Sequence, residues 1–324
     1  MSQSPAKASC RRFRAAKTMD KKPLGTRLKR DFRINWSLYL LVLPVIAFYI
    51  IFHYVPLYGA QIAFKDFSPT DGITGSEWAG LKHFQRFFQG SSVGRVVTNT
   101  FLISFYELIF SFPAPIILAL ALNELRWPKY KRTVQTISYL PHFISMVVVV
   151  GMIKDFTATY GLFNDVIEFF GGRRVNMLSR PQYFRPIYVI SGIWQGIGWN
   201  SIIYIAALSG INSELYEAAS IDGAGRWRRM LNVTLPGIAP TIIILLILRI
   251  GQMLNVGYEK IILLYNPSTY STGDVISSYV YRVGLLERSY SYSTAVGLMN
   301  SVVNFVFVFA ANMISRKVTE TSLW

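Results

Sequence analysis

The sequence predicts an all-α polytopic membrane protein with six transmembrane helices and with both termini in the cytoplasm. The first observation is composition: 52% of the 324 residues are hydrophobic, 15% are charged, and the mean hydropathy is +0.34. A soluble globular protein of this length is less apolar than that. The second observation is a series of long, nearly uncharged stretches, and the third is an uneven distribution of Lys and Arg between alternate loops.

A helix that crosses the hydrocarbon needs about 20 mostly apolar residues, because no water is present there to satisfy the backbone. Glu107 in the second span and Arg249 in the fifth are the charged residues inside the expected spans. Prolines inside or at the ends of the spans predict kinks: Pro44, Pro56, Pro113, Pro115 and Pro141. The transmembrane domain covers residues 36–315, with spans at about 36–60, 96–123, 133–153, 186–211, 238–258 and 293–315.

Orientation follows from the basic residues near the helix ends, which resist translocation. The N-terminal tail, the loop at 126–132, the loop after the fourth span and the C-terminus together carry 20 Lys and Arg, and the opposite side carries 12. The basic tail of residues 1–35 and the C-terminus of residues 316–324 are therefore predicted to be cytoplasmic. Most of the formal net charge of +16 expresses this topology rather than an affinity for nucleic acid.

The tail is too long for the charged region of a secretory signal, and the uncharged run after it exceeds a signal's hydrophobic core. We interpret the first span as an uncleaved signal anchor whose basic tail meets anionic headgroups. A specific partner for the tail is the alternative.

Motifs for catalysis and for metal binding are absent from the sequence. It contains no GxxxxGK[ST] phosphate loop, no HExxH and no GxSxG. Cys10 is the single cysteine, and the three histidines, His53, His83 and His142, are far apart. The sequence therefore gives no reason to expect a metal site, a disulfide or ATP binding by this chain. The sequon that begins at Asn232 falls on the predicted cytoplasmic side and is disregarded.

The cytoplasmic loop of residues 212–237 is the most informative segment. Glu214–Ser220 favours a helix, Asp222–Gly225 interrupts it, and a second helix is expected from Arg226 to about Thr234, ending before Pro236. Two helices joined at an angle would form a compact knob. The small Ala218 and Ala219 would let the knob enter a groove of another protein, where Glu217 could pair with a basic group. An ordinary helical connector is the alternative.

The loop resembles the EAA loop of binding-protein-dependent ABC importer permeases, with EAA at 217–219, Gly at 223 and Leu-Pro at 235–236. The extended form EAASIDGAGRW is similar to the carbohydrate-uptake class. Tyr265–Leu285 and Ser291–Asn304 resemble permeases for complex oligosaccharides and polysaccharides, including alginate importers. The resemblance covers the chain from about residue 35. It departs mildly at Met230 and Val233, where bulky Phe and Ile are common.

The resemblance implies an importer-type ABC permease fold in a bacterial inner membrane. It implies a transport subunit and not an enzyme, working with a second homologous permease subunit, two ATPase subunits and an extracytoplasmic solute-binding protein. ATP and Mg would bind the ATPases, and no cofactor would bind this chain. The positions that would couple to the ATPase are Glu217, Ala218, Ala219, Asp222 and Gly223. The cargo implied is an oligo- or polysaccharide, with neutral and acidic sugars both open.

Sugar sites combine aromatic faces with side chains that replace the hydrogen bonds of water. An intramembrane charge avoids lipid, so Arg249 and Glu107 are expected to face the bundle interior, water or each other. The three-residue spacing of Arg249, Gln252 and Asn255 predicts one face of a helix. An Arg in the pathway would suit an acidic sugar, and a structural ion pair is the alternative. The full set of pathway candidates is Tyr106, Glu107, Trp194, Gln195, Trp199, Asn200, Tyr204, Arg249, Gln252, Asn255, Asn300 and Asn304.

Two weaker patterns complete the sequence. Gly192 and Gly196 fit the small-xxx-small pattern of closely packed membrane helices. The outer loop of residues 266–292, rich in Tyr and Ser, is a candidate docking surface for the binding protein.

A secondary sugar transporter and a polytopic membrane enzyme are the alternative functions. Neither explains the EAA loop, and the sequence shows no internal repeat or catalytic cluster.

Overall fold

The computed structural model describes residues 24–319 and 322–323. The chain forms two units, residues 1–59 and residues 60–324, which are described separately. Most of the basic tail, residues 1–23, lies outside the described part.

The first unit contains one long helical segment. Helix α1 (Leu24–Tyr49) is followed by a π-helical turn, η1 (Ile50–Tyr54), and by α2 (Val55–Tyr58). Asn35 leaves helical geometry, with φ of −109° and ψ of 20°. The kink therefore falls where the charged residues give way to the apolar run.

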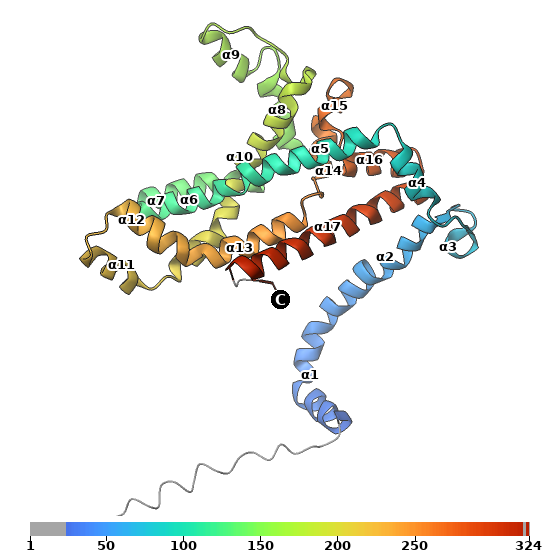
Figure 1. The fold of residues 1–324 in the computed structure, drawn as a ribbon, viewed down its shortest axis with the longest axis horizontal. Helices are drawn as coiled ribbons and strands as arrows, with labels where there is room; N and C mark the ends of the chain where they lie inside the picture. Colours follow the sequence, from blue (N-terminus) through green and yellow to red (C-terminus); the bar gives the residue numbers. More distant parts are fainter. Residues whose placement is uncertain (1–23, 320–321, 324) are drawn as a thin grey trace, which may run out of the picture. The chain divides into compact units, whose positions relative to one another are not determined.

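The second unit is built on long helices that run side by side (Figure 1). Helix α5 (Val93–Tyr106) continues through the π-helical turn η3 (Glu107–Ser111) into α6 (Pro113–Glu124). The other long helices are α10 (Pro181–Ser209), α13 (Leu235–Gly251) and α17 (Tyr290–Thr319). Helix α10 packs on α6, and α13 packs on α17.

Short elements gather at the two ends of these helices. Helices α7 (Pro128–Tyr139), α11 (Ser213–Ile221) and α12 (Arg226–Arg229) lie at one end (Figure 1). The basic residues of the 126–132 loop and of α12 therefore share that end, as one cytoplasmic surface would require. Helices α4 (Lys82–Gln89) and α16 (Ile276–Tyr281) lie at the opposite end.

The remaining elements are short, and most belong to the loops that the sequence places outside. They comprise the 3-10 turn η2 (Gly59–Phe64), α3 (Gly72–Gly75), the antiparallel pair β1 (Lys65–Asp66) and β2 (Glu77–Trp78), α8 (Met146–Thr157), α9 (Leu162–Phe169), α14 (Tyr258–Leu264), α15 (Tyr270–Gly273), the 3-10 turns η5 (Met177–Ser179) and η7 (Pro267–Thr269), and the π-helical turn η8 (Arg282–Leu286).

Within the described residues, five helical stretches have the length and composition to cross a membrane: Phe32–Phe64, Val93–Glu124, Met146–Phe169, Arg226–Gly251 and Tyr290–Lys317. The expected fourth span overlaps α10 up to its end at Ser209, and the 29 residues of α10 extend about 43 Å at 1.5 Å per residue. The expected third span is not one helix. It breaks at the 3-10 turn η4 (Leu140–Phe143), which contains Pro141, and a new helix begins after Ser145, whose side chain accepts a hydrogen bond from the Val148 N–H.

Three of the π-helical turns end two residues before a proline. Turn η1 precedes Pro56, η3 precedes Pro113, and η6 (Met230–Thr234) precedes Pro236. A proline ring collides with the preceding turn of an α-helix and has no N–H to donate. In each of these turns the residue just before the proline donates to a carbonyl five residues back, which widens the helix where the ring needs space.

The expected helix end before Pro236 is therefore wrong. Turn η6 joins α12 directly to α13, and Pro236 lies in the first turn of α13. The helix runs from Arg226 to Gly251 without a break.

Two of the three buried clusters in the second unit share helix α10. One joins α5, α8, α10 and α14 around Ile103, Phe184 and Ile261. The other joins α6, α10 and α13 around Ala119 and Ile238. Helix α10 contributes to both clusters, so it is the shared central element of this unit.

Candidate functional site

A cavity of about 600 Å³ opens among α5–α6, α10 and α13. Its wall combines aromatic, amide and charged groups within an otherwise apolar bundle. The lining residues are Glu107, Ser111, Phe112, Pro115, Gly192, Trp199, Asn200, Ile202, Ile203, Tyr204, Leu245, Leu248, Arg249 and Gln252. A few polar groups on an apolar wall are typical of a small-molecule site.

The two intramembrane charges meet in this cavity. Arg249 donates from Nη2 to Glu107 Oε2 at 2.7 Å, and the two side chains are 38% and 18% exposed. Glu107 begins the π-helical turn η3, and Arg249 lies in the last turn of α13. The two alternatives drawn from the sequence are thus combined: the residues form an ion pair, and the pair faces the cavity.

An aromatic cluster packs against Trp199, which belongs to the cavity wall. The His142 ring stacks parallel to the Trp199 ring with centroids 4.6 Å apart, and Phe143 meets the Trp199 ring edge-on at 5.6 Å. Both partners come from the turn η4 that interrupts the third span. Trp199 is still 44% exposed, so part of its ring surface stays open.

The structure brings Glu107, Trp199, Asn200, Arg249 and Gln252 of the candidates together in the cavity wall, along with Tyr204. It places the others elsewhere. Tyr106 packs against the core cluster around Ile103, and Gln195 donates to the Ile144 carbonyl at 3.4 Å. Trp194 does not line the cavity, and Asn255, Asn300 and Asn304 form a separate group.

The expected helical face of Arg249, Gln252 and Asn255 is wrong. Helix α13 ends at Gly251, and Gln252 already has non-helical angles. Asn255 instead accepts hydrogen bonds from the amides of Asn300 and Asn304 at 2.9 and 3.0 Å. These bonds tie the end of the α13 segment to α17, and they draw Asn255 away from Arg249.

Sequence reasoning missed Ser111 and the wall position of Gly192. The Ser111 hydroxyl is buried without a hydrogen-bond partner among the described residues. Serine is common in membrane helices, so its residue type gave no signal. The π-helical turn that places it beside the cavity is not visible in the sequence pattern.

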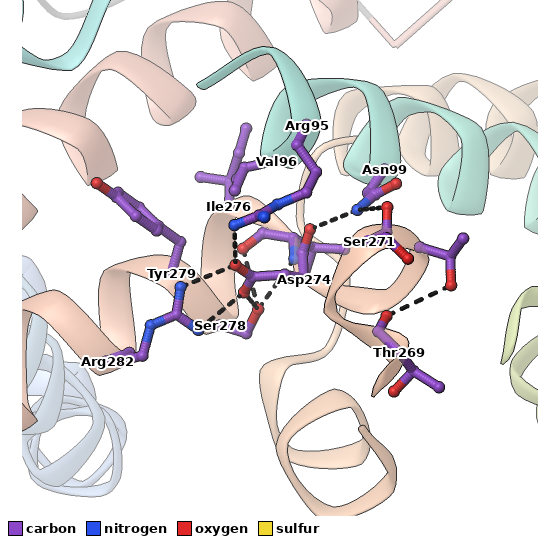
Figure 2. Close-up of polar contacts among 12 residues, drawn as sticks. Arg95, Val96, Asn99, Thr269, Ser271, Asp274, Ile276, Ser278, Tyr279 and Arg282 are labelled. Carbon is purple, nitrogen blue, oxygen red and sulfur yellow. Dashed lines mark hydrogen bonds and ion pairs between the residues drawn. The ribbon is translucent and has the colours of Figure 1, made fainter. Parts of the chain in front are cut away.

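The outer loop is pinned by a buried carboxylate (Figure 2). Asp274 is fully buried, and Arg282 donates to its two oxygens at 3.2 and 2.8 Å. Ser278 donates to the same carboxylate at 2.9 Å, and Arg95 of α5 approaches it at 3.7 Å. The hydrogen bond to Asp274 raises the pKa of Arg282, which therefore stays charged.

Side chains of α5 also hold the backbone of this loop. Asn99 donates to the carbonyls of Ser271 and Asp274 at 3.1 and 3.0 Å (Figure 2). Thr100 accepts from the Ile276 N–H at 2.8 Å. Much of the Tyr- and Ser-rich loop is therefore internal structure, and its exposed part is smaller than the sequence suggested.

The loop of residues 212–237 forms the expected knob of two helices with a break between them. Helix α11 begins after Asn212, whose side chain accepts from the Glu214 N–H at 3.0 Å. It ends at Ile221, and Gly223 two residues later has φ of +71°, a value that favours glycine. The Ala224 N–H donates to the Ala219 carbonyl at 2.9 Å, and the Gly223 N–H donates to the Ser220 carbonyl at 3.1 Å, which together form a Schellman motif.

Side-chain bonds fix the angle between the two helices of the knob. Arg229 donates to the Ser220 hydroxyl at 2.8 Å, and the Tyr216 hydroxyl donates to Thr234 at 3.1 Å. The outer surface stays open, with Ile221 88% and Trp227 75% exposed.

Comparison with known proteins assigns the family. The model described as "Binding-protein-dependent transport system inner membrane component" matches residues 91–320, which is more than two thirds of the chain. The chain belongs to this family. The resemblance seen in its EAA loop is thereby confirmed, and the protein is an inner membrane permease component rather than an enzyme.

Its relatives are close over nearly their full length. The permease is 46% identical to Protein LplB of Bacillus subtilis (strain 168), over 92% of each chain. It is 43% identical to the polygalacturonan/rhamnogalacturonan transport system permease protein YteP of the same organism, over 89% of this chain and 90% of that protein.

Solved structures agree with the fold. The permease shares 46% identity and a TM-score of 0.83 with a chain of a bacterial ABC transporter involved in the import of the acidic polysaccharide alginate, covering 90% of this chain and 99% of that one. A bacterial alginate transporter in complex with a periplasmic protein that holds an alginate pentasaccharide gives 45% identity and a TM-score of 0.84, covering 92% of this chain and 100% of that one.

The close helix contact of the permease is not at the expected glycines. A Cβ on Gly192 would meet Lys260, and a Cβ on Gly196 would meet the Asn200 side chain. A Cβ on Gly198 would instead overlap the backbone of Ser138 in α7. The small-xxx-small pattern therefore identified the right helix but the wrong residues, because it carries no information on which face meets a neighbouring backbone.

Within the part of the permease that the structure describes, no group of three or more His, Cys, Asp or Glu is placed to hold a metal ion.

Proposed function

We propose that the chain is one of two nonidentical permease subunits of an ABC importer that carries an oligo- or polysaccharide with acidic groups across the bacterial inner membrane. The match to alginate importer structures over nine tenths of the chain carries this proposal. The relative named for polygalacturonan transport also handles a uronate polymer. The cavity supports the substrate class, since it combines the exposed Trp199 with Asn200, Gln252 and Arg249.

Two ATPase subunits would bind ATP and Mg below the membrane and receive the knob of the cytoplasmic loop in a groove. Exposed Ile221 and Trp227 give that knob an apolar surface. Glu217 is exposed and has no hydrogen bond or ion pair with the described residues, so its carboxylate is available to a partner. Ala218 and Asp222 lie on the same short helix or at its end and are exposed as well.

The continuous helix gives the importer a direct mechanical connection. The 26 residues of Arg226–Gly251 extend about 39 Å from the knob to the cavity wall. A movement of the ATPase groove would tilt this helix and shift Arg249 at its far end. Alternating access would then follow from rigid-body movement between two states that bind the sugar differently.

A solute-binding protein would deliver the sugar at the opposite end. The loop held by Asp274 offers exposed Leu285 and Leu286 there. This surface is rigid because the loop is hydrogen-bonded to α5, so a partner could bind it without first ordering it.

The test is ATPase activity of the co-expressed complex in liposomes, with binding protein and a panel of neutral and uronate oligosaccharides. Wild type should respond to uronate oligomers, and Glu217→Lys should abolish the response. Glu124→Lys is the matched control, because it makes the same charge change at the exposed end of α6 outside the knob. A Glu217→Lys complex that responds like wild type would refute coupling through the knob, and a response confined to neutral sugars would refute the acidic substrate.

A further inference from the structure

A buried lysine lies next to the cavity. Lys260 of α14 is 6% exposed, and its Nζ donates to the Tyr188 carbonyl of α10 at 2.8 Å. The ammonium also lies 4.6 Å from the centre of the Tyr188 ring. Neither contact neutralises its charge, because a carbonyl and an aromatic ring are uncharged partners.

Gly192 is the cavity-wall residue that lies next to this ammonium. Gly192 belongs to the cavity wall, and a Cβ built on it would lie 3.4 Å from Lys260 Nζ. A side chain at this position would contact the ammonium. An ammonium has three donors, and one of them is used by the Tyr188 carbonyl.

The charges around the cavity do not balance. Arg249 is offset by Glu107 at 2.7 Å, whereas Lys260 forms no ion pair among the described residues. One positive charge is therefore in excess beside the cavity. An unpaired charge in a membrane protein is costly and is usually found where an ion or substrate passes.

We propose that Lys260 is a specificity-determining residue, which attracts the carboxylates of an acidic sugar to the cavity past the side-chain-free position at Gly192. The inference rests on the proposed function, and it identifies the side chain that would distinguish an acidic sugar from a neutral one. Arg249 serves this purpose less well, because Glu107 already occupies it.

The experiment compares a uronate oligosaccharide with its methyl ester, which has the same length without the charges. Uptake of both is measured in proteoliposomes holding the complete transporter, at a saturating concentration of one binding protein, for wild type, Lys260→Met, Lys260→Arg and Gly192→Ala. Lys260→Met should lower the preference for the acid over the ester roughly tenfold, the size expected for a lost charged hydrogen bond.

Two variants distinguish a role of Lys260 in recognising the substrate's charge from a role in packing alone. Lys260→Arg keeps the charge and should keep most of the preference. Gly192→Ala keeps Lys260 but inserts a methyl group in front of its ammonium, and it should weaken the preference without reducing the amount of assembled complex.

The outcomes distinguish the two proposals. An equal loss of acid and ester uptake in Lys260→Met, or no rescue by arginine, would mean that the lysine only ties α14 to α10, and the inference would be overturned. An unchanged preference in Lys260→Met would overturn it too, while the acidic substrate stands. Wild type that carries neither compound would contradict the proposed function itself.

Discussion

Replacement of Asp274 by Asn should destabilise the end of the permease that holds the loop of residues 266–292. The carboxylate is fully buried, and the guanidinium of Arg282 donates to both of its oxygens. Removing one partner of a buried pair costs about 3–5 kcal/mol, because the other charge is left uncompensated. The Arg282 side chain is 22% exposed, which reduces the expected cost to about 2–4 kcal/mol.

The distances from Arg282 and Arg95 to Asp274 predict that variants of these partners lose different amounts of unfolding free energy. Arg282→Lys keeps the charge but loses the two-pronged geometry, so it should cost about half as much as the loss of Asp274. Arg95 approaches Asp274 at 3.7 Å, and its side chain is 43% exposed. Arg95→Gln should therefore cost less than about 1 kcal/mol.

Thermal unfolding of the purified complex in nanodiscs, followed by intrinsic fluorescence, measures this series. A loss of about 3 kcal/mol corresponds to a fall in Tm of roughly 5–10 °C for a chain of this size. If Arg95→Gln lowered the Tm as far as Asp274→Asn, the argument from distance and burial would be wrong. An Asp274→Asn protein as stable as wild type would show that the carboxylate is not the anchor of the loop.

Two further predictions concern the membrane part. Glu107→Gln leaves Arg249 uncompensated and should cost about 2 kcal/mol in the same unfolding assay; adding Arg249→Met should recover part of that loss, whereas two additive losses would show that the charges do not interact. Gly198→Ala would overlap the Ser138 backbone and should cost about 1–3 kcal/mol and lower the yield of assembled complex. Gly196→Ala is the control, since its Cβ meets only a flexible side chain, and equal losses in both variants would refute the close approach.

The knob could be predicted from the sequence because its signals are local. The break at Gly223 depends on the φ of one residue, and a glycine there is visible in the sequence. Most of the expected fourth span also falls on one helix, α10, since a long apolar run depends only on composition.

Other expectations failed where backbone geometry depends on neighbours. The rule that a helix ends before a proline failed at Pro236, because a π-helical turn made space for the ring. The spacing of Arg249 and Asn255 suggested a shared face, but the helix ends between them.

The cavity was predictable in part. Polar and aromatic residues inside apolar spans are few, so Glu107, Trp199 and Arg249 could be singled out by residue type. Lys260 could not, because it follows the expected fifth span and nothing local indicates that α14 packs it against Tyr188. The residues beside the cavity that the sequence did not reveal are placed there by long-range packing.

The π-helical turn at Glu107–Ser111 acts as one extra residue inside a membrane helix. An α-helix advances 100° per residue, so the part after the turn is out of phase with the part before it. Cysteine accessibility along α5 and α6 would follow two periodic patterns, offset by one residue at this turn, and no single helical wheel would describe both halves. A deletion of one residue within the turn would convert it into a regular α-helical turn and leave Ala119 in its core position, whereas a one-residue deletion elsewhere in the span would rotate the residues beyond it by about 100°.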